Sequence, residues 1–233
     1  MSNKRASKDR KARLAEIQKQ QKASERRVRM IVIAACVVLL AGIAGVVVYA
    51  LNDARSKQLP NLGVTVAAAH CDPVTNDAST CSGEHIGPGT NQPDKTSATY
   101  DTVPPSHGQH FAQPDISGRD FYSATDRPPL ETLVHNLEHG YTILWYDGTK
   151  VKDTGLLKEI ADKANKLPEA SGKFKAVEWD PSRGAFPQGK PYVLSHWAKE
   201  AGHRQQCGDL SGQVVVDFVK KYQKDDTQEP GAA

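Results

Sequence analysis

Histidines are the residues of this chain whose number and spacing could do chemistry. The sequence has eight of them, all after residue 69, and four lie in two short segments, PPSHGQH and HNLEHG. A neutral imidazole is the commonest metal ligand in proteins. The pattern therefore predicts a metal site, and loop-capping histidines that bond backbone carbonyls are the alternative. The candidates are His85, His107, His110, His135 and His139.

The spacing of His135 and His139 depends on the element that carries them. Residues i and i+4 of a helix project from one face and can share one ion. On a strand the same interval separates the side chains by about 13 Å, too far for one ion. Residues 133–137 are expected to form a helical turn or a short strand, and Gly140 is typical of a residue that ends a helix. The helical form would place both imidazoles at one site.

Residues 135–139 also fit the H-x-x-E-H pattern of inverzincin metallopeptidases, in which two histidines bind zinc and the glutamate activates water. The match is short, and Gly140 stands where those enzymes continue the helix. A zinc hydrolase with Glu138 as the base is therefore a third interpretation.

Imidazole ligands suit zinc and copper alike. Both methionines, Met1 and Met30, lie outside the expected domain, so no thioether pattern for reduced copper is present.

An apolar segment near the N-terminus predicts a membrane helix. Residues 30–51 carry no charge, and a helix of that length spans about 33 Å, enough for a bilayer core of about 30 Å. Residues 1–29 hold eleven Lys and Arg but three acids. This bias predicts a cytoplasmic N-terminus and an uncleaved anchor, with a cleaved signal as the alternative. The remaining residues are net acidic, which argues against a nucleic-acid-binding domain.

Four cysteines are consistent with that topology. Cys36 lies inside the apolar segment, and Cys71, Cys81 and Cys207 follow it, where disulfides can persist. Three is an odd number, so one of them stays unpaired or pairs between chains. Cys71–Cys81 is the slightly favoured pair, and either residue could instead bond Cys207.

The second half of the chain has the pattern of a layered α+β domain. Segments 141–146, 174–179 and 192–197 are typical of strands, and 154–167 and 213–222 have a helical period. We expect one small mixed sheet covered on one face by two helices, with long N-terminal loops. The expected parts are a basic cytoplasmic tail (1–29), a transmembrane helix (30–51), a stalk and first strand near 62–68 (52–69), a single extracytoplasmic domain (70–225) and a disordered tail (226–233).

Several short strings suggest a family. They are Glu84-His85-Ile86, Pro104-Pro105, Val134-His135, Leu137-Glu138-His139-Gly140 and, near the end, Trp197, Phe218 and Tyr222. With them the chain resembles the bacterial domain-of-unknown-function family 3105, whose members are membrane-anchored or secreted. The resemblance implies no particular activity. It points to His85, His110, His135 and His139 as the metal ligands, because members often have Gly in place of His107, and to Glu131 and Glu138 as acids that orient imidazoles.

These observations lead to three functional interpretations. The first is a single-pass bacterial membrane protein whose extracytoplasmic domain binds zinc or copper through the four histidines, without a predicted enzymatic activity. The second is an envelope interaction module with structural histidines that assembles with a membrane-protein partner. The third is the zinc hydrolase. The histidine spacing favours the first, and the sequence indicates no oligomeric state.

Overall fold

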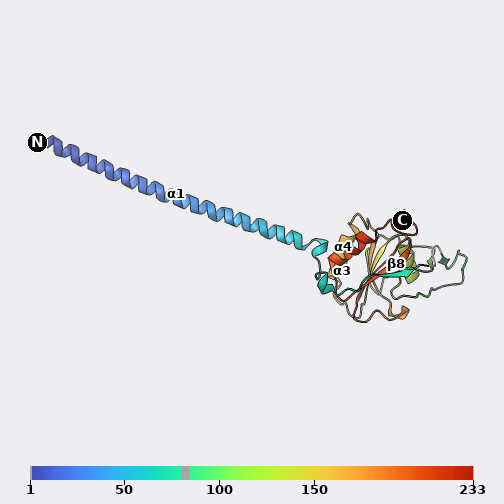
Figure 1. The fold of residues 1–233 in the computed structure, drawn as a ribbon. Helices are drawn as coiled ribbons and strands as arrows, with labels where there is room; N and C mark the ends of the chain where they lie inside the picture. The colour runs from blue at the N-terminus through green and yellow to red at the C-terminus, as the bar shows by residue number, and fades with distance from the viewer. Residues whose placement is uncertain (1, 80–83, 233) are drawn as a thin grey trace. The chain divides into compact units, whose positions relative to one another are not determined.

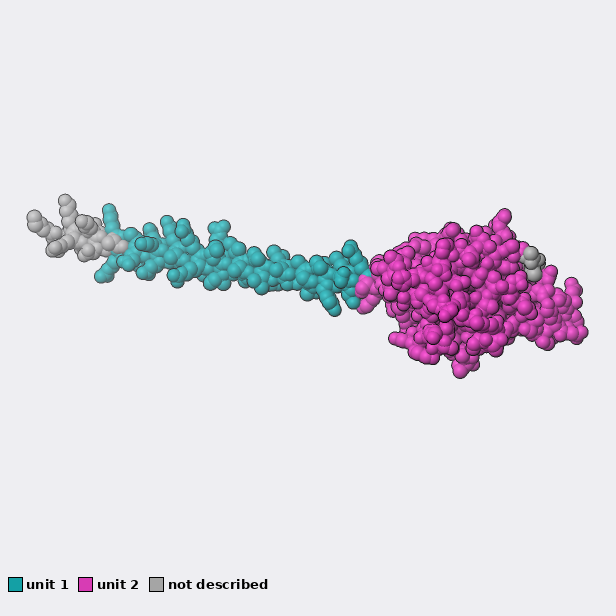
Figure 2. Space-filling view, turned by 60° about the horizontal axis from the view of Figure 1, so that its bottom comes forward, with its two compact units in different colours: residues 1–55 teal, residues 56–233 magenta. Residues whose placement is uncertain are grey.

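The computed structural model describes residues 2–79 and 84–232. It divides the chain into two compact units, residues 1–55 and residues 56–233, which Figure 2 shows in different colours.

The first unit is one long helix, α1 (Ser2–Ser56). Its part from Arg13 to Ser56 contains an 18-residue stretch with a mean hydropathy of 3.1 and no burial, which is long and apolar enough to cross a membrane. Large apolar side chains such as Val38 and Tyr49 are exposed along it. Exposed apolar surface of this extent requires an apolar environment. Such a helix is typical of a membrane anchor or of a signal sequence, and it confirms the expected apolar N-terminal helix.

The second unit is built on a mixed six-stranded sheet (Figure 1). In spatial order, neighbours among the first four strands pair antiparallel and neighbours among the last three pair parallel, with the fourth strand common to both sets. A separate parallel ladder joins two short strands, β2 (His85–Ile86) and β3 (His110–Phe111). The sheet order is β1 (Thr75–Ala78), β8 (Ala201–Cys207), β7 (Tyr192–Trp197), β5 (Thr142–Tyr146), β6 (Phe174–Glu178) and β4 (Phe121–Tyr122).

Helices cover both faces of this sheet, which explains why every residue of β5 is buried. Leu144 and Tyr146 pack with α3 (Gly155–Asn165) and α4 (Gly212–Lys221) in one core. Ile143 and Trp145 point to the opposite face and pack against α2 (Leu130–Glu138), because successive strand residues alternate. The α+β class with a mixed sheet is confirmed. The expected pair of helices corresponds to α3 and α4, and α2 covers the second face.

The element boundaries expected from the sequence agree closely with the structure in the second half of the chain, and they differ from it in the first half. Residues 62–68, where we expected the first strand, instead form a single bridge from Gly63 to Ser211 and lead into the 3₁₀ helix η2 (Ala67–Ala69). The other 3₁₀ helices are η1 (Leu59–Asn61) and η3 (Pro181–Arg183). Strand β8 was not expected, because its sequence AGHRQQC is mostly polar.

The disulfide differs from the favoured pair. Cys71 bonds Cys207, 136 residues away in the sequence. The backbone N–H of Asp72 donates to the carbonyl of Gln206 at 2.8 Å, and that of Gly208 donates to Ala69 at 2.9 Å. These bonds hold the segment around Cys71 beside the end of β8. Cys81 lies outside the described residues.

Candidate metal centre

The β2–β3 ladder places two of the predicted histidines side by side. His85 and His110 are direct partners in its register, and their ring centroids lie 4.8 Å apart. Side chains of paired residues in adjacent strands project from the same face. Gly108 helps to fix the chain just before β3: its φ is +139°, and a Cβ there would lie 2.8 Å from the Tyr100 ring. The ladder therefore holds the two imidazoles together although 25 residues separate them in sequence.

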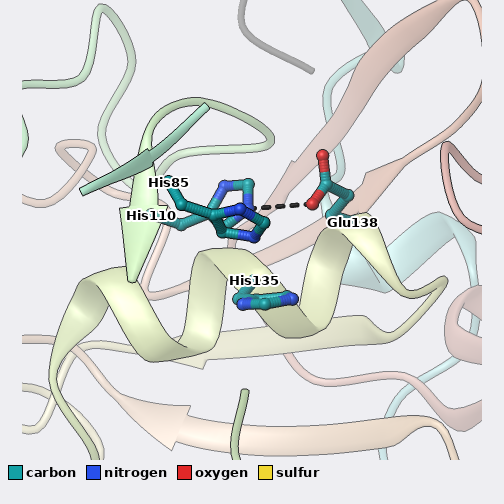
Figure 3. Close-up of side chains that lie close together, drawn as sticks. All are labelled: His85, His110, His135 and Glu138. Atoms are coloured by element: carbon teal, nitrogen blue, oxygen red, sulfur yellow. Dashed lines mark ion pairs between the residues drawn. The ribbon is translucent and has the colours of Figure 1, made fainter. Parts of the chain in front are cut away.

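Helix α2 contributes the other residues of the group. His135 and Glu138 lie one turn apart near its C-terminal end. The His135 ring centroid lies 4.7 Å from that of His110 and 5.0 Å from that of His85. Glu138 places its Oε2 atom 2.8 Å from Nε2 of His110, and both side chains are fully buried. Figure 3 shows the two strand histidines above the helix that carries His135 and Glu138.

Backbone carbonyls determine which ring nitrogen faces the centre. Nδ1 of His110 lies 2.8 Å from the Gly108 carbonyl, and Nδ1 of His135 lies 2.6 Å from the Phe111 carbonyl. A carbonyl only accepts hydrogen bonds, so Nδ1 carries the proton in both rings, and in the neutral form of each ring the lone pair is on Nε2. Metal-binding histidines characteristically donate from the second nitrogen in this way. Nε2 of His110 and Nε2 of His135 are thus presented as ligand atoms.

The four side chains have the chemistry of a transition-metal site. Their candidate ligand atoms all lie within 4.8 Å of one another. Nε2 of His85 is buried without a hydrogen-bond partner among the described residues, which is costly for a polar atom unless a ligand compensates. Three imidazoles and one carboxylate match the donors that zinc takes, and copper accepts the same set. The residues therefore fit a single ion of either metal.

The electrostatics of the group favour neutral imidazole. The pKa of His135 is lowered to about 4, chiefly by burial and also by the neighbouring His110, His139 and His85, against the opposing effect of the Phe111 carbonyl. His135 is therefore neutral at neutral pH, which is the form that binds a metal.

His139 belongs to a second, adjoining group. It caps α2, and its Nε2 lies 2.9 Å from Nε2 of His135 and 3.2 Å from Oε2 of Glu229. The structure thus brings all four predicted histidines into one cluster, but it groups His139 with His135 and Glu229 rather than with His85 and His110.

Glu229 was not predicted, because residues 226–233 were expected to be a disordered tail. In the structure Thr227 and Glu229 lie against the end of α2. Thr227 is fully buried and its hydroxyl donates to the Glu138 carbonyl at 2.5 Å, while the Glu229 backbone N–H donates to the same carbonyl at 3.2 Å. No sequence pattern marks this contact, since its acceptor is a main-chain carbonyl.

Glu131 and His107 lie elsewhere. Oε1 of Glu131 accepts from the backbone N–H of Ala98 at 2.9 Å and from Arg183 at 2.7 Å, so the implied role of orienting an imidazole finds no support in its contacts. Nδ1 of His107 lies 3.1 Å from the Ser106 hydroxyl, and its ring lies against Trp197. His107 belongs to neither ligand group.

A pocket of about 470 Å³ opens near the N-terminus of α2. Its charged residues are largely paired with one another, as Arg183 with Glu131 and Arg127 with Asp180. Trp145 and Trp179 supply its apolar wall. The candidate metal ligands do not line this pocket.

Taken with the fold, these features define a class: an α+β domain with a buried histidine–carboxylate centre, preceded by an apolar N-terminal helix. The chain belongs to the family of proteins of unknown function DUF3105, whose family model matches residues 91–233. The match includes both ligand groups except His85, which precedes it. No curated protein and no solved structure matches the chain.

Proposed function

We propose that this chain is a membrane-anchored, extracytoplasmic protein whose globular unit binds one transition-metal ion, zinc or copper. The ligands are His85, His110, His135 and Glu138. The observation that carries the proposal is the convergence of these side chains from two short strands and one helix, within 4.8 Å of one another. Elements so far apart in sequence rarely bring three imidazoles and a buried carboxylate together without a ligand to bind.

The first unit and the disulfide support this location. Membrane helices preceded by a Lys/Arg-rich segment tend to keep that basic end in the cytoplasm, which supports a globular unit outside a bacterial cell membrane. The Cys71–Cys207 bond agrees with an oxidising compartment. The bilayer is then the partner of residues 30–51.

The test is the metal content of the full chain in detergent micelles, purified without a histidine tag and measured by elemental mass spectrometry. We expect about one equivalent of zinc or copper, lost in a His110→Gln/His135→Gln variant. The control is His203→Gln, because His203 bonds Asn76 on the sheet and belongs to neither ligand group. Wild-type protein that takes up neither metal, even when supplied with each, contradicts the proposal and favours an interaction module with structural histidines.

A further inference from the structure

The two ligand groups share one residue, His135. Its Nδ1 atom is occupied by the Phe111 carbonyl at 2.6 Å, so only Nε2 is available to a metal in either group. That atom lies 2.9 Å from Nε2 of His139 and also belongs to the group of His85, His110 and Glu138. An imidazole nitrogen has a single lone pair in the ring plane, so it binds one ion at a time. The two groups therefore describe two positions for one ion.

The two positions differ in their access to solvent. In the inner group the side chains of His110 and Glu138 are 0% exposed and His135 is buried, while His85 is half-buried. In the outer group His139 is 9% exposed and Glu229 is 47% exposed. A hydrated cation must lose its water before it reaches the inner group, and ligands that replace the water stepwise lower the cost of that transfer. The outer group offers such ligands where the cluster approaches the surface.

We propose that His139 and Glu229 form an entry site for a divalent metal cation, which then passes through Nε2 of His135 to the inner group. The inference rests on the proposed function, since it needs the inner group to bind metal. The carboxylate of Glu229 attracts the cation and His139 supplies the first nitrogen. Because His135 is common to both positions, the ion can change position while it keeps one ligand.

Backbone contacts hold the entry site in place. Lys173 donates from Nζ to the carbonyl of His139 at 2.8 Å and to that of Ala232 at 2.7 Å, which joins the end of α2 to the C-terminal segment. Thr227 and the N–H of Glu229 bond the Glu138 carbonyl on the other side. These hydrogen bonds to main-chain atoms hold Glu229 beside His139.

The competing entrance is a pocket of about 300 Å³ lined by Glu84, His85 and Gln92. It reaches the inner group at His85 itself, and neither His139 nor Glu229 lines it. A kinetic experiment separates the two entrances, because only residues on the actual path change the rate of loading.

The experiment measures metal loading and release by stopped flow, with the full chain in detergent micelles, Zn²⁺ as the probe and a chromophoric chelator as the reporter. Glu229→Gln is the test variant. Asp225→Asn is the matched control, because it removes the same charge from a nearby exposed residue that lies in neither ligand group. A local negative charge accelerates the binding of a cation by about tenfold or more.

We expect Glu229→Gln to slow loading and release by the same factor, about tenfold, with an unchanged dissociation constant and one equivalent of Zn²⁺ bound. A residue on the path, unlike one at its end, changes both rates together. His139→Gln should behave similarly, and Asp225→Asn should match the wild type.

Four results overturn the inference while leaving the proposed function intact. Glu229→Gln could load Zn²⁺ as fast as the wild type, or it could raise the dissociation constant through faster release alone. Two equivalents of Zn²⁺ could bind at once, or Glu84→Gln could slow loading when Glu229→Gln does not. Failure of the wild type to bind any Zn²⁺ or copper is the separate result that rejects the proposed function.

Discussion

At the scale of single residues, the centre depends on main-chain carbonyls as much as on side chains. Gly108 and Phe111, two residues before and one after His110, supply the carbonyls that fix His110 and His135. One short segment therefore orients two rings on different elements. Because these acceptors are main-chain atoms, no side-chain type marks them in the sequence, and the sequence signal for them is weak.

Glu138 and Glu131 allow the role of the carboxylate to be tested on one helix. Both are buried on α2, but Glu138 contacts His110 whereas Glu131 bonds Arg183. We expect Glu138→Gln to weaken metal binding at least about tenfold, because the neutral amide is a poorer ligand. Glu131→Gln should lower the free energy of unfolding by about 1–3 kcal/mol and keep the metal affinity. Equal metal affinities in the two variants would show that Glu138 is not a ligand.

His196 predicts a pH dependence of stability outside the metal centre. Burial lowers its pKa from 6.5 to about 4, although the Asp226 carbonyl and charge oppose this and His203 adds to it. Its Nε2 lies 2.8 Å from that carbonyl, in the geometry of a neutral ring that donates. The unfolded chain takes up a proton below pH 6.5 and the folded chain does so only near pH 4.

The stabilisation from neutral His196 is therefore complete above pH 6.5 and is lost as the pH falls toward 4. The loss amounts to at most about 3 kcal/mol. Urea unfolding of the metal-free chain, repeated across this pH range, measures it. His196→Gln should show a shallower decline than the wild type, and parallel curves would rule out His196 as the source.

At the scale of elements, the end of α2 depends on Gly140. Its φ is +88°, and a Cβ there would lie 2.1 Å from the Lys224 carbonyl. Gly172 has the same φ of +88° with no atom within 4 Å of its Cβ position, so it is a matched control. We expect Gly172→Ala to cost about 1–2 kcal/mol from backbone conformation alone.

Gly140→Ala adds the contact with Lys224 and should cost roughly 1–3 kcal/mol more. It should also displace the C-terminal segment and slow metal loading as Glu229→Gln does. Denaturant unfolding and stopped-flow loading measure the two effects. Equal losses of stability in both alanine variants would mean that the close approach at Gly140 does not constrain the segment.

Elements with a strong pattern were predictable from the sequence. The TILWY segment forms β5 and the apolar period of residues 213–222 forms α4. Strand β8 is mostly polar, so its sequence gives only a weak strand signal. Its buried Arg204 is stabilised by an ion pair with Asp77 on β1 rather than by apolar burial. Strands of two residues such as β2 and β3 lack any period at all. Their pairing depends on tertiary contacts.

The candidate site was predictable in its residue types but not in its grouping. Helical spacing correctly brought His135 and His139 together. It was the family resemblance that implied that both bind one ion with His85 and His110, whereas the structure groups Glu138, and not His139, with those two residues and His135. The difference arises because residue i+3 of a short helix can face the ladder while residue i+4 lies at the C-cap.

At the scale of the whole molecule, one disulfide links the start of the globular unit to its last strand. Cys71 lies before β1 and Cys207 ends β8, so the bond closes a loop that contains the sheet and both ligand groups except Glu229. Both cysteines border the core formed by α3 and α4. The metal centre packs on the opposite side, with α2. Stability and metal binding are therefore expected to respond differently to loss of this bond.

A Cys71→Ser/Cys207→Ser variant tests that expectation. A loop of 136 residues gives an entropic stabilisation of about 4–5 kcal/mol in the chain-entropy model. We expect the urea midpoint of the variant to fall well below that of the wild type. The variant that remains folded should still bind metal with wild-type affinity. Cys36→Ser is the control, because Cys36 is a free thiol in α1 and its removal should leave the midpoint unchanged.

Reduction of the wild type should reproduce the double variant, and it should have no effect on the variant itself. If the variant unfolds at the wild-type midpoint, the bond does not stabilise the globular unit. If it remains folded but loses its metal, the two sides of the sheet are coupled. The centre would then depend on the oxidation state of this bond, because reduction of one distant disulfide would release the ion.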